Sequence, residues 1–328
     1  MPVVDVHTHM LTQNYLDLLV EYGAPQYQRT VNQAGEDVIL AGSVPFFTLN
    51  SAMWDYERRI QDMDAAGVDI AVVSLTCPNV YFGDADTSLA AARSINDSMA
   101  AAQTAWPGRI RWFASLPWQY PERAVAELDR ARNAGAAGVI VIATIGEKQL
   151  TDPGFEPVWA EIDRLALPVL VHPGPPIGAQ ALGLADYGLV PSAGFPFDTT
   201  LAFARMFFDG FLDRFTRLKL IAAHGGGALP YLAARLDRCH AEIAACSAKT
   251  ATRPSEYMQR IYYDAVVYSP AALSLCIEAA GSADRVLFGS DYPHNIGDMA
   301  GCLERTNRLP QDWAERVRGQ NAVDLFGL

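Results

Sequence analysis

The chain has 328 residues, half of them hydrophobic, and a formal net charge of −12. This acidic balance argues against a nucleic-acid or anionic-membrane partner. We expect no membrane span, because no apolar run approaches the required length, and no secretory leader, because no charged-then-apolar pattern opens the sequence. The five cysteines show no CxxC spacing, which favours reduced thiols in the cytoplasm over a disulfide framework or a cysteine zinc site.

Short apolar runs alternate with longer segments of helical period along the chain. Strands are expected at Val3–His9, Ile70–Thr76, Ile110–Leu116, Gly138–Ala143, Pro168–His172, Leu218–His224, Ile261–Val267 and Arg285–Ser290. Helices are expected at Trp54–Ala66, Thr87–Trp106, Pro121–Asn133, Phe155–Leu165, Thr199–Phe215, Leu229–Cys246, Ala271–Ala280 and Gln311–Phe326. Eight β-then-α units predict an α/β fold, a (β/α)₈ TIM-type barrel forming one domain over residues 1–328. An open doubly wound sheet is the alternative, but no GxGxxG follows the first strand.

Three long segments interrupt this rhythm, each directly after a predicted strand. They are the insertion Leu11–Met53, the Gly- and Pro-rich Pro173–Asp198, and Tyr292–Met299. Barrel enzymes carry their sites at the C-terminal ends of the strands. We therefore expect these segments to act as lids or pocket walls.

The first predicted strand ends in His7-Thr8-His9. Strand side chains alternate between two faces, so the two imidazoles point the same way and can share one divalent ion. Asp5 has the same parity and is either an orienter of these histidines or a polar group at the bottom of the barrel. Two histidines alone do not make a metal site, so the other strand ends decide the question.

Further His and Asp residues stand at the ends of other predicted strands. His172 ends the fifth strand, His224 the sixth, and Asp291 the eighth. With His7 and His9, five such side chains converge on one end of the barrel, which predicts a metal site.

Each residue also has a plainer interpretation. His172 could be capped by backbone, His224 could serve the glycine turn that follows it, and Asp291 could cap the next loop. His240 lies within a predicted helix and is interpreted as a surface or packing residue. His294 lies in the loop after the eighth strand, near the barrel mouth, where it can contact substrate.

This pattern resembles the amidohydrolase superfamily. It is more narrowly similar to the branch that contains 2-amino-3-carboxymuconate-6-semialdehyde, γ-resorcylate and 5-carboxyvanillate decarboxylases. The resemblance runs end to end and rests on Val-Leu-Val-His-Pro at 169–173, His-Gly-Gly-Gly at 224–227, Gly-Ser-Asp-Tyr-Pro at 289–293, Trp54-Asp55 with Arg59, Gly67-Val68-Asp69 and Gln320-Asn321-Ala322.

The resemblance implies a set of site residues. The metal ligands would be His7, His9, His172 and Asp291, with His224 as the acid/base residue beside the metal. Binuclear members use a lysine after strand four, whereas this strand ends in Val-Ile-Ala-Thr and Lys148 lies further along. One divalent metal is therefore expected, with zinc as first choice and manganese as the rival.

Two positions bear on substrate and assembly. Arg235 matches an arginine that in the muconate semialdehyde decarboxylases of this branch reaches the substrate carboxylate of a neighbouring subunit. This resemblance implies a homodimer or higher homo-oligomer; a surface charge on the helix is the alternative. The first-loop arginine of the branch is replaced near Phe46-Phe47. An aromatic wall of Phe47, with Phe46, Phe195, Phe197 and Tyr292, then favours a small aromatic or unsaturated carboxylate, although loop packing explains any one of these residues alone.

The favoured function is metal-dependent nonoxidative decarboxylation, in which His224 or Asp291 handles the proton that replaces carbon dioxide. The alternative is metal-dependent hydrolysis of a lactone, amide or related bond with the same residues. A third possibility, a binding protein that kept the barrel and lost activity, is disfavoured by the five intact positions.

Overall fold

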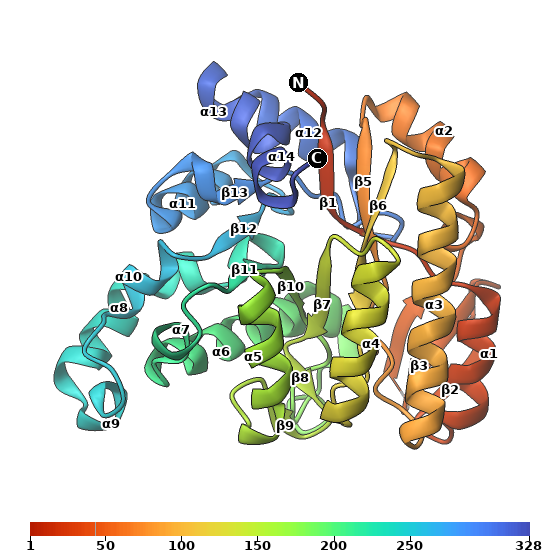
Figure 1. Cartoon of the computed structure of the whole chain (residues 1–328), viewed down its shortest axis with the longest axis horizontal. Helices are drawn as coiled ribbons and strands as arrows, with labels where there is room; N and C mark the ends of the chain where they lie inside the picture. Colours follow the sequence, from red (N-terminus) through yellow and green to blue (C-terminus); the bar gives the residue numbers. More distant parts are fainter. Residues whose placement is uncertain (43) are drawn as a thin grey trace.

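The computed structural model describes residues 1–42 and 44–328. Its main sheet has eight parallel strands, in the order β1 (Val4–His9), β5 (Ile70–Ser74), β6 (Ile110–Ser115), β7 (Gly138–Ile142), β10 (Pro168–His172), β11 (Lys219–Ala222), β12 (Tyr262–Asp264) and β13 (Val286–Leu287). The two edges of the sheet meet, because the N–H of Val6 donates to the Phe288 carbonyl at 3.0 Å and that of His9 to the Tyr292 carbonyl at 2.7 Å. The predicted (β/α)₈ barrel is confirmed (Figure 1).

Helices alternate with these strands along the chain. They are α2 (Tyr56–Ala66), α3 (Ala85–Ala105), α4 (Pro121–Asn133), α5 (Glu156–Leu165), α6 (Phe195–Phe208), α8 (Leu229–Glu242), α11 (Pro270–Ala280) and α14 (Asn321–Phe326). Local sequence explains several of their ends. The Asp55 side chain accepts the Arg58 N–H and begins α2, and Gly67, at φ 77°, ends it.

Two predicted helices are broken in the structure. The helix expected at Thr199–Phe215 is split into α6 and α7 (Phe211–Arg214) by Gly210, which adopts φ 64°. The helix expected at Leu229–Cys246 divides into α8 and α9 (Ala244–Ser247). Short elements that the sequence did not predict are β8 (Thr144–Ile145), β9 (Lys148–Gln149), α10 (Pro254–Met258) and α12 (Met299–Asn307); α13 (Gln311–Glu315) lies in the predicted C-terminal helical segment.

The insertion after β1 is folded rather than an irregular loop. It contains α1 (Gln13–Tyr22) and an antiparallel sheet of β2 (Tyr27–Val31), β3 (Asp37–Ala41) and β4 (Val44–Thr48). Ile39 and Phe46 are buried on this sheet. In Figure 1 the two chain ends lie at the top of the barrel, whereas β2 and β3 lie at the lower right.

The strands are buried on both faces, as expected of a parallel barrel. One apolar cluster joins alternate residues of the strands and is closed by α14: Val4, Val6, Val72, Phe113, Ile140, Leu170, Ile221, Ala223, Leu287, Ala322 and Leu325. The intervening strand residues, such as Val73 and Val141, belong to the larger cluster shared with the helices. None of the described helices is long and apolar enough to cross a membrane.

A β-bulge changes the phase of β1 just before the histidines. The pairing with β5 passes from Asp5 opposite Ala71 to Thr8 opposite Val73, so β1 carries one extra residue there. Val4 and Val6 face the barrel interior, and the bulge turns His7 toward the same interior. The expectation that Asp5 shares a face with His7 and His9 is therefore wrong, because strict alternation does not hold across a bulge.

Candidate metal centre and active site

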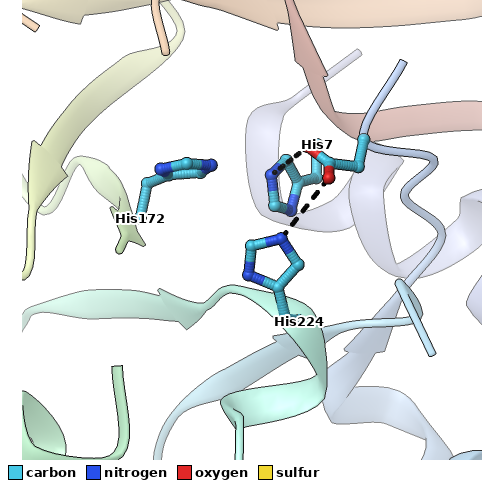
Figure 2. Close-up of side chains that lie close together, drawn as sticks. His7, His172 and His224 are labelled. Carbon is cyan, nitrogen blue, oxygen red and sulfur yellow. Dashed lines mark ion pairs between the residues drawn. The ribbon is translucent and has the colours of Figure 1, made fainter. Parts of the chain in front are cut away.

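The histidines at the end of β1 meet at the carboxyl end of the barrel. His7 Nε2 lies 3.2 Å from His9 Nε2, and both side chains are fully buried. The His172 ring, at the end of β10, has its centroid 5.1 Å from that of His7 and 4.8 Å from that of His9. Figure 2 shows His7, His172 and His224 gathered around one small space.

Hydrogen bonds to the Nδ1 atoms orient these rings. His7 Nδ1 is 2.5 Å from Asp264 Oδ2, and His9 Nδ1 is 3.1 Å from Ser74 Oγ. His172 Nδ1–H donates to the Pro173 carbonyl at 2.8 Å. With Nδ1 of His7 and His172 donating, their Nε2 atoms carry lone pairs and are available as metal ligands.

Asp291 completes the cluster from the loop after β13. Its Oδ1 lies 3.2 Å from His9 Nε2 and 3.5 Å from His7 Nε2. Burial alone would raise the pKa of Asp291, but the imidazoles of His224, His9 and His7 that face its carboxylate hold this pKa well below its usual value. Asp291 adopts φ 59°, in the left-handed region that is uncommon for residues other than glycine.

His224 faces Asp291 from the turn after β11. Its Nε2 lies 3.6 Å from Asp291 Oδ2, and its backbone is also left-handed, with φ 55°. The glycines that follow allow this turn to pack closely, since a Cβ at Gly227 would lie 2.1 Å from the Pro196 carbonyl oxygen. His224 therefore stands on the open side of the cluster, where an acid or base can reach a bound molecule.

Asp264 is a site residue that the sequence analysis missed. This fully buried residue ends β12, and its carboxylate accepts the N–H groups of His224 and Gly225 at 2.9 Å in addition to its bond with His7. Asp264 therefore holds both the ring of His7 and the backbone of His224 in place. It was missed because the strand was predicted to continue to Val267, which placed Asp264 in mid-strand, whereas β12 ends at Asp264.

Asp5 orients the backbone on both sides of the cluster. Its Oδ1 accepts the N–H groups of His7 at 3.2 Å and Ser290 at 3.1 Å, and its Oδ2 accepts the Ser290 hydroxyl at 2.5 Å. Burial raises the pKa of Asp5 to about 6. Of the two roles considered for Asp5, these contacts favour the orienting one.

Arg59 is a buried cation behind the same segments. Its guanidinium donates to Thr8 Oγ1 at 2.6 Å and to the His9 carbonyl oxygen, and it lies 4.7 Å from the centre of the Tyr292 ring. Both Arg59 and Thr8 are fully buried. Arg59 thus connects the strand end that carries His9 to the loop that carries Asp291.

A cavity of about 260 Å³ opens beside the cluster. His172, His224 and Asp291 form its polar end, and Phe46, Phe47 and Phe195 belong to its aromatic wall. His294 also lines it, with Nε2 3.0 Å from Thr76 Oγ1 and its ring centroid 6.2 Å from that of Phe47. The cavity therefore combines imidazole and carboxylate groups with aromatic side chains, a lining that can hold an apolar ring with polar substituents.

Comparison with known proteins identifies the family. A family model described as amidohydrolase matches residues 4–328. The chain belongs to the amidohydrolase family. The family resemblance inferred from the strand-end motifs is thus confirmed.

Named relatives of this amidohydrolase are decarboxylases. The 2-amino-3-carboxymuconate-6-semialdehyde decarboxylase of Dictyostelium discoideum is 29% identical over 332 residues, covering 99% of this chain and 91% of the relative. The γ-resorcylate decarboxylase of Polaromonas is 30% identical over 306 residues, covering 88% and 93%. The crystal structure of 5-carboxyvanillate decarboxylase from Sphingomonas paucimobilis superposes with a TM-score of 0.85 at 28% identity and covers 100% of this chain and 99% of that one.

Other residues singled out in the sequence lie away from this cavity. Arg235 is exposed on α8, and Phe197 is 55% exposed on α6. Tyr292 packs on Arg59 and donates its hydroxyl to Asp62 at 2.6 Å, so it supports the site from behind. His240 is buried rather than on the surface, with Nε2 3.0 Å from the Thr250 carbonyl oxygen, which agrees with the packing interpretation. Lys148 pairs with Asp152 at 3.4 Å.

The donor atoms in this amidohydrolase fit a divalent metal ion. His7, His172, His224 and Asp291 each offer one ligand atom within 4.8 Å of the others, and His9 and His294 do so together with Asp291. His172 Nε2 and Asp291 Oδ1 are buried and have no hydrogen-bond partner among the described residues. Buried donors and acceptors normally have partners, so these free atoms are consistent with metal ligation.

Proposed function

We propose that this amidohydrolase is a metal-dependent nonoxidative decarboxylase, a carboxy-lyase that acts on a small aromatic or unsaturated carboxylate. The observation that carries the proposal is that the His and Asp cluster and the aromatic side chains line one cavity. The named relatives, which are decarboxylases, support the same reaction class.

The proposed cofactor is one divalent metal held by His7, His9, His172 and Asp291. Three imidazole nitrogens and one carboxylate suit zinc first, and manganese is the rival. A single ion is favoured because β7 is followed by Ala143 and Thr144, not by a lysine that could bridge two ions. When bound, the ion supplies a positive charge that binds and polarises substrate oxygens.

The remaining steps fall to the protein. In decarboxylation the bond from the ring carbon to the carboxylate breaks, carbon dioxide leaves, and a proton takes its place on that carbon. His224 is positioned to deliver this proton, since it lines the cavity, and the Asp291 carboxylate, 3.6 Å away, would stabilise the protonated imidazole. Asp264 and Arg59 hold the histidine-bearing segments in place throughout.

Phe47 and His294 are the proposed substrate contacts within the chain. Phe47, with Phe46 and Phe195, offers aromatic surface to the ring, and His294 offers an imidazole next to Thr76. Arg235 cannot take part from within its own chain, because it is exposed on α8. We propose that it acts on the site of a second copy, which makes the active form a homodimer or higher homo-oligomer of chains that each fold as one domain.

The alternative function is metal-dependent hydrolysis. It is supported by the same cluster, because His224 beside Asp291 could equally activate a water molecule. Metal-replete protein should be incubated with aromatic carboxylates labelled with ¹³C in the carboxyl group, and with lactone and amide analogues, in ¹⁸O water. We expect labelled carbon dioxide and a product one carboxyl group shorter. Products that gain ¹⁸O without loss of carbon dioxide would replace the lyase by the hydrolase.

A further inference from the structure

A second cavity of about 430 Å³ adjoins the metal-side cavity. The two share Phe46 and Cys77 in their walls, and the insertion sheet contributes to both. In the second cavity Tyr27, Ala41 and Val44 come from that sheet, and Ile142 and Thr144 come from the end of β7 and the residues after it. We call it the annex.

Phe46 is the partition between the two cavities. It is buried, and its ring lies 6.3 Å from that of Tyr27 on the annex side. On the metal side it lies 5.4 Å from Phe47 and 6.4 Å from Phe195. A substituent on a ring bound against Phe47 would therefore enter the annex once it extends past Phe46 and Cys77.

The annex is uncharged. Among the described residues that line it, none has a formally charged side chain at neutral pH, and burial raises the pKa of the shared Cys77 thiol to about 12. The buried carboxylate of Asp198 accepts hydrogen bonds from two groups of the lining, Thr144 Oγ1 and the Gly174 N–H. A second carboxylate on the substrate would find no cation here and would approach a buried acid, so the annex disfavours an anion.

The annex also offers hydrogen bonds. The buried hydroxyl of Tyr81 has no partner among the described residues, and the side-chain amides of Gln26 and Gln180 lie in the same lining. A buried donor without a partner costs free energy that a ligand oxygen can recover. The lining thus suits an apolar group that carries an ether or carbonyl oxygen.

Resting on the proposed decarboxylase function, we propose that the annex is a substrate subsite. It would bind an uncharged, oxygen-bearing substituent of the substrate ring while the carboxylate occupies the metal side. The preferred substrates would then be aromatic carboxylates with a neutral side chain of a few atoms, rather than bare hydroxybenzoates or dicarboxylates.

The test compares 2,6-dihydroxybenzoate with analogues that carry a propoxy or a propyl group at each free ring position. We expect at least one propoxy analogue to exceed the parent acid in kcat/KM by about ten-fold or more, the scale that a few buried methylene groups give. Ala179→Phe, which fills the annex, should abolish this advantage and leave the parent acid within about three-fold. Ala181→Phe, an exposed alanine in the same loop, is the matched control. Tyr81→Phe should weaken the propoxy analogue and not the propyl analogue.

Binding separates failure of the annex from failure of the reaction. Calorimetry can use the phenols that correspond to the test compounds without their carboxylate group. Binding of these phenols reports occupancy of the annex even if no carboxylate is decarboxylated. Tighter binding of the propoxy phenol that Ala179→Phe removes would support the subsite whatever the reaction proves to be. The proposed subsite would be overturned if Ala179→Phe affected the parent and the substituted compounds equally. It would also be overturned if no substituent raised either kcat/KM or binding affinity.

Discussion

Two parts of the molecule meet at the cavity and are built in different ways. The barrel side presents imidazoles and a carboxylate whose positions are fixed by strand ends and by buried partners such as Asp264 and Arg59. The insertion side presents Phe46 and Phe47 from a small antiparallel sheet. The difference suggests a division of labour, in which the barrel supplies the chemistry and the insertion selects the substrate.

The largest expected effect is on the barrel side. His172→Ala removes a proposed metal ligand, whose Nε2 has no hydrogen-bond partner among the described residues. We expect loss of bound metal and a fall in activity of more than about 100-fold, since even residues behind the ligands are worth 10–100-fold. Metal content and turnover measure this. His240→Asn is the control, a buried histidine outside the cluster. Full metal content and activity in His172→Ala would show that His172 is not a metal ligand.

Asp264→Asn should weaken metal binding although Asp264 is not itself a proposed ligand. The amide keeps the shape but cannot hold His7 Nδ1–H with a negative charge, so we expect metal affinity to fall by about 10–100-fold. Competition with a chelator measures the dissociation constant. Asp97→Asn, which alters an exposed pair with Arg130, should leave this constant unchanged. Equal affinity in the Asp264 variant and the native protein would show that the contact does not tune the ligand.

Arg59→Met tests the support behind the site. It leaves Thr8 Oγ1 and the His9 carbonyl without their buried donor, so we expect the free energy of unfolding to drop by about 2–4 kcal/mol. Thermal or denaturant unfolding measures it. Arg59→Lys should restore only part of the lost unfolding free energy, because an ammonium group cannot reproduce the planar set of donors of a guanidinium. Arg58→Lys, at an exposed neighbouring pair, should change stability by less than about 0.5 kcal/mol.

The insertion side should respond differently. Phe47→Ala should raise KM for an aromatic carboxylate by about ten-fold with metal content unchanged, because it removes apolar surface and no ligand. Phe47→Arg should shift preference toward dicarboxylates. If either variant lost its metal, the proposed division of labour would fail.

The sequence predicted the strand-end residues well because one rule applies to all of them. In a parallel barrel every strand ends on the same face, so His7, His172, His224 and Asp291 had to meet once eight strands were assigned. Asp264 was missed because its strand was predicted to continue to Val267, whereas β12 ends at Asp264.

Other features depend on tertiary contacts that no local pattern reveals. The bulge in β1 reverses the expected facing of Asp5, and its cause lies in the pairing with β5. The insertion was expected to be a loop, since its strands are short and form a sheet only with one another. The annex could not be predicted, because its walls come from segments far apart in the chain.

The most direct test of the central claim is a metal titration of metal-free protein followed by carbon dioxide release. With ¹³C-carboxyl-labelled hydroxybenzoates, including the preferred analogue, we predict that labelled carbon dioxide production rises in proportion to bound zinc or manganese and levels off at one ion per chain. Activity that needs two ions per chain, or that is independent of metal, would contradict the single site at His7, His9, His172 and Asp291. No labelled carbon dioxide at any metal loading would contradict the decarboxylase itself.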